Sequence, residues 1–162
     1  SQIDPADLRK KLSYVPQDIH LFRNTIKNNI LGTYKFVDDQ WLIECSKISG
    51  TDEFIKLHPM GYDMPIGERG AGLSGGQRQS VGIARALINN SNIWLFDEPT
   101  NAMDQTILNN LNEKLEDKTL LLVTQKMNLL ALASRVIVMN QGEKVLDGKK
   151  EDVIKKLGVN NG

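Results

Sequence analysis

The sequence has little of the chemistry that supports several common functions. Its one cysteine, Cys45, cannot form a disulfide within the chain, and its two histidines, His20 and His58, stand alone without a metal-ligand pattern. Twenty Lys and Arg residues balance twenty Asp and Glu residues, so the chain lacks a basic field that would attract nucleic acid or an anionic membrane. We therefore expect a reducing, cytosolic setting and no nucleic-acid partner.

Long apolar runs are missing as well. The apolar runs at 93–96 and 119–123 are far shorter than the roughly 20 residues of a membrane-spanning helix, and no cleavable signal opens the chain. Its 162 residues, 40% hydrophobic and 25% charged, are typical of one soluble globular domain with a sizeable core. Any association with a membrane is expected to come from a partner or from sequence beyond these residues.

Short β-rich runs alternate with longer helical patterns. Strands are expected at 11–15, 93–96, 119–123, 135–139 and 144–146, and helices at 25–31, 38–48, 76–88, 105–115, 128–133 and 151–157. Residues 59–72 are rich in Gly and Pro and are expected to form loop or turns. The alternation predicts an α/β fold with a mostly parallel sheet flanked by helices, in which ligands bind beyond the carboxyl ends of the strands.

Two adjacent carboxylates, Asp97 and Glu98, follow the apolar run at 93–96. Four large apolar residues predict a strand covered on both faces. Two carboxylates at its exit are costly to hold together unless a cation or a proton offsets their charge, which suggests magnesium-binding and water-activating groups. For the pair alone, however, a buried strand ending in a solvated acidic turn is the better explanation.

The segment Leu73-Ser74-Gly75-Gly76-Gln77 precedes a strong helical pattern. Glycines let backbone amides approach a ligand closely, and the start of a helix presents unpaired N–H groups with a positive dipole end, so the segment can bind a phosphate. The Ser74 hydroxyl is an additional donor. An ordinary helix cap at Ser74 would explain this segment taken alone, but not its combination with the acidic strand end.

With these motifs together, the chain resembles the nucleotide-binding domain of the ATP-binding cassette (ABC) transporter family, in which LSGGQ is the signature and an apolar strand ending in DE is the Walker B motif. Further motifs appear in the family's order. VPQD places Gln17 in the Q-loop, GERGAG is similar to the exporter X-loop, and NAMD places Asp104 in the D-loop. The resemblance extends over essentially all 162 residues.

The amino-acid sequence is most similar to the sequences of exporters. The segments QDIHLFRNTIKNNI and GERGAGLSGGQRQ are similar to exporter cassettes, and the C-terminal VTQKMNLLALASRVIVMNQGEKVLDG resembles the bacterial type I exporters that secrete toxins or other large polypeptides. Multidrug and lipid exporters share much of this sequence, so these subfamilies remain alternatives. Soluble cassette ATPases and uptake cassettes are disfavoured.

The resemblance implies how the domain is organised. Residues 1–17 and 91–162 would form part of a P-loop NTPase-like α/β core, and an α-helical subdomain at about 18–90 would carry the Q-loop, X-loop and signature. The family's N-terminal β-subdomain would be missing. The resemblance also places the domain at the cytoplasmic face of the inner membrane, attached to transmembrane domains.

The resemblance further implies a mechanism in which two cassettes enclose two ATP molecules. Residues 74–77 would contact the γ-phosphate of ATP held by the partner cassette, and Asp104 would communicate between the sites. Asp97 would hold Mg²⁺ through water, Glu98 would act as general base, and Gln17 would sense the metal and the attacking water. Phosphoryl transfer depends on positioning and charge neutralisation, so these groups must face the same phosphate.

Two departures from the family pattern bear on activity. None of the 162 residues forms the Walker A loop G-x-x-x-x-G-K-[ST] that cradles phosphates, so we expect this polypeptide to be inactive alone. The second is Gln125, where the family has its switch histidine. Glutamine can donate a hydrogen bond to a phosphate but cannot carry the imidazolium charge. Three interpretations stay open: the site hydrolyses ATP slowly or is degenerate, the chain is a regulatory or interaction module, or the glutamine is a tolerated change in an active enzyme.

Overall fold

A computed structural model of the chain describes residues 4–99 and 103–158. The chain divides into two compact units, residues 1–125 and 126–162. In unit 1 the elements are α1 (Pro5–Lys11), β1 (Leu12–Val15), β2 (Asn24–Thr25), α2 (Ile26–Leu31), α3 (Asp39–Ile48), α4 (Thr51–Ile55), the 3₁₀ turns Gly61–Asp63 and Glu68–Gly70, β3 (Pro65–Ile66), α5 (Gly75–Ile88), β4 (Ile93–Asp97), α6 (Gln105–Glu113) and β5 (Thr119–Val123).

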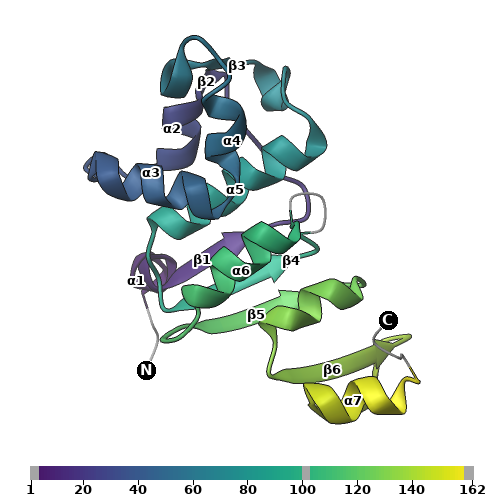
Figure 1. Ribbon diagram of the computed structural model, residues 1–162. Helices are drawn as coiled ribbons and strands as arrows, with labels where there is room; N and C mark the ends of the chain where they lie inside the picture. Colours follow the sequence, from purple (N-terminus) through teal and green to yellow (C-terminus); the bar gives the residue numbers. More distant parts are fainter. Residues whose placement is uncertain (1–3, 100–102, 159–162) are drawn as a thin grey trace. The chain divides into compact units, whose positions relative to one another are not determined.

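The centre of unit 1 is a three-stranded parallel sheet in the order β1-β4-β5 (Figure 1). Val15 of β1 lies beside Phe96 of β4, and Asp97 of β4 lies beside Val123 of β5. Helix-containing segments connect the strands, as parallel pairing requires. The expected α/β fold with a parallel sheet flanked by helices is therefore confirmed, and the carboxyl ends of all three strands share one edge.

One face of this sheet forms the core beneath α5. Trp94 and Phe96 of β4 point to this face, where each is 2% exposed and their rings stack with centroids 5.9 Å apart. Ser13, the β1 partner of Trp94, donates from its hydroxyl to the Ala86 carbonyl of α5 at 2.7 Å. Alternation along β4 thus buries two large aromatic residues under the helix that carries the Ser-Gly-Gly segment.

The opposite face corrects the expectation of a strand covered on both faces. Tyr14, Leu95 and Leu121 lie side by side on the three strands. Tyr14 is 53% exposed and Leu121 60% exposed, whereas Leu95 is half-buried. The apolar run predicted the position of the strand correctly, but its composition could not reveal that, among the described residues, only one face is covered.

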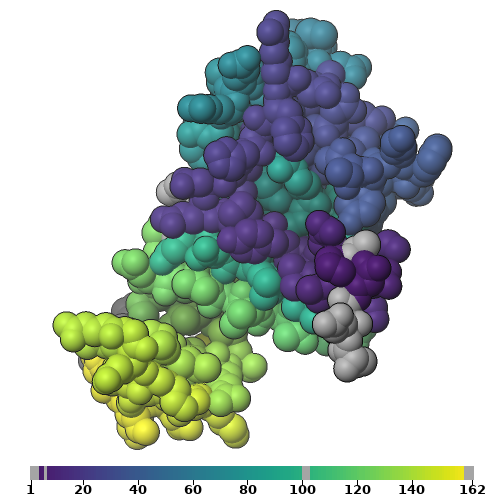
Figure 2. All heavy atoms as spheres, turned by 180° about the vertical axis from the view of Figure 1, so that it is seen from behind, coloured from purple at the N-terminus to yellow at the C-terminus, as the bar shows by residue number. Residues whose placement is uncertain are grey.

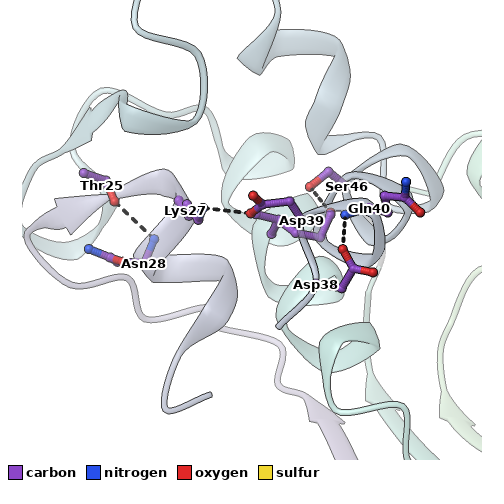
Figure 3. A network of polar contacts seen from close by, with 8 residues as sticks. Thr25, Lys27, Asn28, Asp38, Asp39, Gln40 and Ser46 are labelled. Atoms are coloured by element: carbon purple, nitrogen blue, oxygen red, sulfur yellow. Dashed lines mark hydrogen bonds and ion pairs between the residues drawn. The ribbon is translucent and has the colours of Figure 1, made fainter. Parts of the chain in front are cut away.

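Residues 18–90 contain four helices, of which α2, α3 and α4 all contact α5. Helices α2 and α3 each begin with a side-chain cap: Thr25 accepts from the Asn28 amide and Asp38 from the Gln40 amide (Figure 3), which satisfies donors that a helix start leaves unpaired. An ion pair between Lys27 and Asp39 at 3.0 Å connects α2 with α3. Because this ion pair is exposed, it contributes little to stability. The packing of α2 and α3 against α5 therefore holds these helices in place.

Segments far apart in sequence meet around α5. β1 and α2, from the first third of the chain, both contact this helix, and seen from behind the purple residues of that third lie against teal residues of the α5 region (Figure 2). Helix α5 is therefore the element that joins the sheet to the helical part.

The structure adds elements that the periodicity did not predict. Helices α1 and α4 are only seven and five residues long, too short for a helical repeat to be counted reliably. Within the Gly- and Pro-rich stretch 59–72, β3 pairs with β2 between two 3₁₀ turns. The stretch is therefore mostly turn, as expected, with one short strand.

The described part of unit 2 contains a 3₁₀ helix, a β-hairpin and an α-helix. It consists of the 3₁₀ helix Met127–Leu132, β6 (Arg135–Asn140), β7 (Glu143–Lys149) and α7 (Lys150–Lys156). β6 and β7 are antiparallel, and Gln141 and Gly142 between them have φ of 48° and 83°, as a tight hairpin turn requires. Arg135 donates to both carboxylate oxygens of Asp147 at 2.9 and 3.0 Å and, with Lys144, lowers the pKa of Asp147 to about 2.

Candidate functional site

Four residues singled out from the sequence follow the carboxyl ends of three neighbouring strands. Gln17 comes two residues after β1, Asp97 is the last residue of β4, Glu98 comes next, and Gln125 comes two residues after β5. Gln17 and Gln125 are exposed, and the two carboxylates are half-buried. The parallel sheet thus brings all four to one edge, where α/β folds bind their ligands.

Glu98 has an unusual backbone conformation. Its φ is 48°, in the left-handed region, which costs a residue with a Cβ about 1–2 kcal/mol. Two hydrogen bonds hold it there: its N–H donates to the Val123 carbonyl of β5 at 2.9 Å, and its carbonyl accepts from Nε2 of Gln79 in α5 at 3.1 Å. The carboxylate beside Asp97 therefore stands on a backbone held by both a strand and a helix.

The Ser-Gly-Gly segment forms the start of α5. Ser74 is its N-cap and accepts from the Gln77 amide at 3.1 Å, while the Gln77 side-chain oxygen accepts from the Ser74 amide at 2.9 Å. This reciprocal pair is a capping box. The cap predicted for Ser74 is present, and the intervening residues, exposed Gly75 and half-buried Gly76, lie at a helix start whose dipole favours an anion.

Asp104 lies near this helix start. It is the exposed N-cap of α6 and accepts from the Ile107 amide at 2.9 Å. Gly76, Gln77 and Asp104 all line an open pocket of about 520 Å³, with Phe54 and Ile107 among its apolar walls. Two further residues of the NAMD segment, 101 and 102, lie outside the described residues.

The site residues therefore form two groups within unit 1. The strand-edge group contains Gln17, Asp97, Glu98 and Gln125, and the helix-start group contains residues 74–77 and Asp104. The first group offers carboxylate and amide oxygens that suit a hard cation and a water molecule. The second offers backbone N–H groups that suit a phosphate.

Sequence reasoning missed two polar residues of α5, the buried Gln79 and the half-buried Arg85. Gln79 is 3% exposed and contacts Glu98, as described above. Arg85 donates to the carbonyls of Asn29 at 2.7 Å and His20 at 3.2 Å, and burial lowers its pKa. A polar residue inside the apolar stripe of an amphipathic helix was the available signal. Cys45 is buried as expected, and burial raises its pKa to about 12.

Known proteins of one family are similar to this chain. Residues 1–101 match the family described as ABC transporter. The chain is 38% identical over 156 residues to the leukotoxin export ATP-binding protein LtxB of Aggregatibacter actinomycetemcomitans, covering 94% of this chain and 22% of that protein. It is 36% identical over 155 residues to the toxin RTX-I translocation ATP-binding protein of Actinobacillus pleuropneumoniae, covering 93% of this chain and 22% of that protein.

A solved structure described as a bacterial Atm1-family ABC exporter with ATP bound is also similar, with a TM-score of 0.86 and 34% identity, covering 93% of this chain and 27% of that chain. The chain thus spans between a fifth and a third of the length of these proteins. The family match covers more than half of the chain, and the fold agrees with that of a solved exporter. The chain belongs to the ABC transporter family.

Proposed function

We propose that this chain is the greater part of a nucleotide-binding domain that couples ATP binding and hydrolysis to the export of a polypeptide or toxin. The observation that carries the proposal is the strand edge, where Asp97, Glu98, Gln17 and Gln125 follow three parallel strands. The toxin-export relatives support the exporter assignment. The proposed site lies at the cytoplasmic face of the inner membrane.

In the proposed reaction the carboxylate of Glu98 is the general base. It accepts a proton from the water that attacks the γ-phosphorus, while the bond from this phosphorus to the β,γ-bridging oxygen breaks and ADP leaves. Gln17 orients the attacking water from the neighbouring strand. This division suits phosphoryl transfer, in which the protein positions the reactants and offsets their charge.

The residues present suit a magnesium ion. Asp97 is the last residue of β4, and Gln17 comes two residues after the adjacent strand β1. Residues 4–99 and 103–158 contain no group of three His, Cys, Asp or Glu that could hold a metal. Mg²⁺ usually takes only one or two carboxylates and fills its remaining positions with water and phosphate oxygens. Asp97 would hold the ion through water and Gln17 would sense it, and the ion would offset phosphate charge.

The helix-start group is proposed to act on a second nucleotide. Ser74, Gly75, Gly76 and Gln77 would bind the γ-phosphate of ATP held by a partner cassette, and Asp104 would communicate between the two sites. The existence of two separate groups, one at the strand edge and one at the start of α5, supports this arrangement. A dimer of cassettes and the transmembrane domains of the exporter are the proposed partners.

The first prediction tests nucleotide binding by this polypeptide alone. We expect weak affinity for Mg-ATP and no appreciable hydrolysis, because none of the 162 residues forms a Walker A loop. Isothermal titration calorimetry checks the affinity, and phosphate release checks the hydrolysis. A dissociation constant in the low micromolar range, about −8 kcal/mol, would contradict this prediction.

Kinetic tests need a protein that also contains a Walker A loop to bind the phosphates. A suitable protein is a chimera in which residues 1–162 replace the matching segment of the Atm1-family exporter, whose solved structure aligns with 93% of this chain. We call it the exporter chimera. Hydrolysis by the chimera would support the proposed function, and ATP binding without hydrolysis would favour the alternative of a degenerate, regulatory cassette, which Gln125 motivates.

The second prediction concerns Gln125. In the exporter chimera, Gln125→His is expected to raise turnover by roughly tenfold with little change in KM for ATP, because an imidazolium can stabilise charge in the transition state that an amide cannot. Steady-state phosphate release measures both constants. Gln105→His, at an exposed glutamine in α6, is the control, and unchanged or lower turnover in Gln125→His would show that position 125 does not limit hydrolysis.

The third prediction is that the 162-residue chain self-associates without nucleotide. The row Tyr14, Leu95 and Leu121 presents apolar surface to solvent on the sheet face, and such surface favours association. Sedimentation at tens of micromolar should show oligomers, and Leu121→Lys should weaken them at least tenfold. Phe36→Lys, at a residue 98% exposed elsewhere, is the control. A wild-type monomer, or a Leu121→Lys oligomer of unchanged affinity, would refute this face as the interface.

The transmembrane domains are proposed as partners and are not found within the described part of this chain. No helix among residues 4–99 and 103–158 has the length and apolar character needed to cross a membrane. Exporter relatives support partners that supply the membrane-spanning part.

A further inference from the structure

Gln79 of α5 connects the two groups of site residues. It lies two positions after Gln77, which belongs to the helix-start group, and its side chain reaches Glu98 in the strand-edge group. Its Nε2 donates to the Glu98 carbonyl at 3.1 Å, and the residue is 3% exposed. A hydrogen bond made by a buried amide is costly to lose, so this bond is a strong local restraint.

The bond acts on a conformation that needs support. At a φ of 48°, Glu98 can lower its energy by returning to an ordinary backbone conformation unless its surroundings prevent it. The Val123 carbonyl holds the N–H of Glu98 and Gln79 holds its carbonyl. Removing the contribution of Gln79 would leave the peptide that follows Glu98 without this restraint.

Helix α5 also contacts the segment after β1. Gly82 lies three positions after Gln79, and a Cβ added at Gly82 would collide with the Ile19 side chain, which shows how closely the helix approaches there. Ile19 lies two positions after Gln17. The same helix therefore restrains Glu98 through a hydrogen bond and contacts the Gln17 segment through close packing.

We infer that Gln79 is a positioning residue that fixes the backbone of Glu98 and couples its carboxylate to the start of α5. The catalytic part of this inference rests on the proposed function, in which Glu98 acts on the chain's own ATP and residues 74–77 act on the partner's ATP. A shift of the first turn of α5, caused by phosphate binding in one site, is then transmitted through Gln79 to the general base of the other site.

Hydrogen exchange in the 162-residue chain tests the structural part without nucleotide. Gln79→Met keeps the length of the side chain and removes the donor, and Gln105→Met, at an exposed glutamine that donates to Asn109 in α6, is the matched control. We expect exchange of the Glu98 amide to rise at least tenfold in Gln79→Met only, and the Glu98 ¹³Cα shift to move away from its left-handed value. The amides of β5 that do not neighbour Glu98 should exchange at their wild-type rates.

Unchanged exchange and an unchanged ¹³Cα shift at Glu98 would overturn the inference. An equal rise at all amides of the sheet would overturn it too, because Gln79 would then stabilise the whole unit and not position Glu98.

Kinetics of the exporter chimera test the catalytic part. Gln79→Met is expected to lower kcat by about 10- to 100-fold, since small displacements of a catalytic group have effects of this size, while KM for ATP changes less than about twofold. An unchanged kcat would overturn the coupling to catalysis. Glu98→Gln separates the two claims: if it keeps wild-type turnover, the proposed role of Glu98 as general base fails, and if it loses turnover while Gln79→Met keeps it, only the inference fails.

Discussion

Replacing Glu98 by glutamine is expected to lower ATP turnover of the exporter chimera by about 100-fold or more, because general-base catalysis contributes on this scale. Glutamine has nearly the same shape, and both hydrogen bonds at position 98 involve only its backbone or the Gln79 side chain. The substitution therefore removes the basic carboxylate without removing the restraints on the backbone. Single-turnover phosphate release measures the chemical step directly.

The matched control is Glu113→Gln, which removes an exposed carboxylate at the end of α6 and should leave turnover unchanged. ATP binding should be retained in Glu98→Gln, because the loss lies in proton transfer and not in ground-state contacts. A Glu98→Gln chimera with turnover within about threefold of wild type, a change of only about 0.6 kcal/mol, would show that another group activates the water.

The strand-edge group could be predicted from sequence because its members are near in sequence to strands with clear patterns. The sequence shows two adjacent carboxylates after the apolar run and a glutamine shortly after each neighbouring strand. Parallel pairing then places them at one edge without further information. The helix start at Ser74 was predictable for a similar reason, since a capping box depends on residues only three positions apart.

What could not be predicted depends on contacts between distant parts of the chain. The left-handed conformation of Glu98 requires Val123 and Gln79, which lie 25 positions after it and 19 positions before it. No local pattern contains these bonds. The expectation that β4 is covered on both faces was wrong for the same reason, because an apolar residue in a strand does not state which element covers it.

The carboxyl end of β4 also depends on the packing of this strand. We therefore expect substitution of its buried residues to lower the free energy of unfolding strongly. Phe96 immediately precedes Asp97 and stacks on Trp94, so its ring supports the end of the strand from which both carboxylates extend. Leu121, on the neighbouring strand, is a large apolar residue whose side chain is 60% exposed. The two residues therefore separate burial from apolar character within one sheet.

Phe96→Ala is expected to lower the free energy of unfolding of unit 1 by about 3–5 kcal/mol, the cost of a buried cavity of this size, whereas Leu121→Ala should cost less than about 1 kcal/mol because most of that side chain is already in water. Urea denaturation followed by tryptophan fluorescence measures both values, since Trp94 contacts the deleted ring. Submicromolar chain concentrations keep self-association from adding to the apparent stability. Equal losses for the two variants would mean that the face bearing Leu121 is as well covered as the face beneath α5, which would remove the basis for self-association through that face as well.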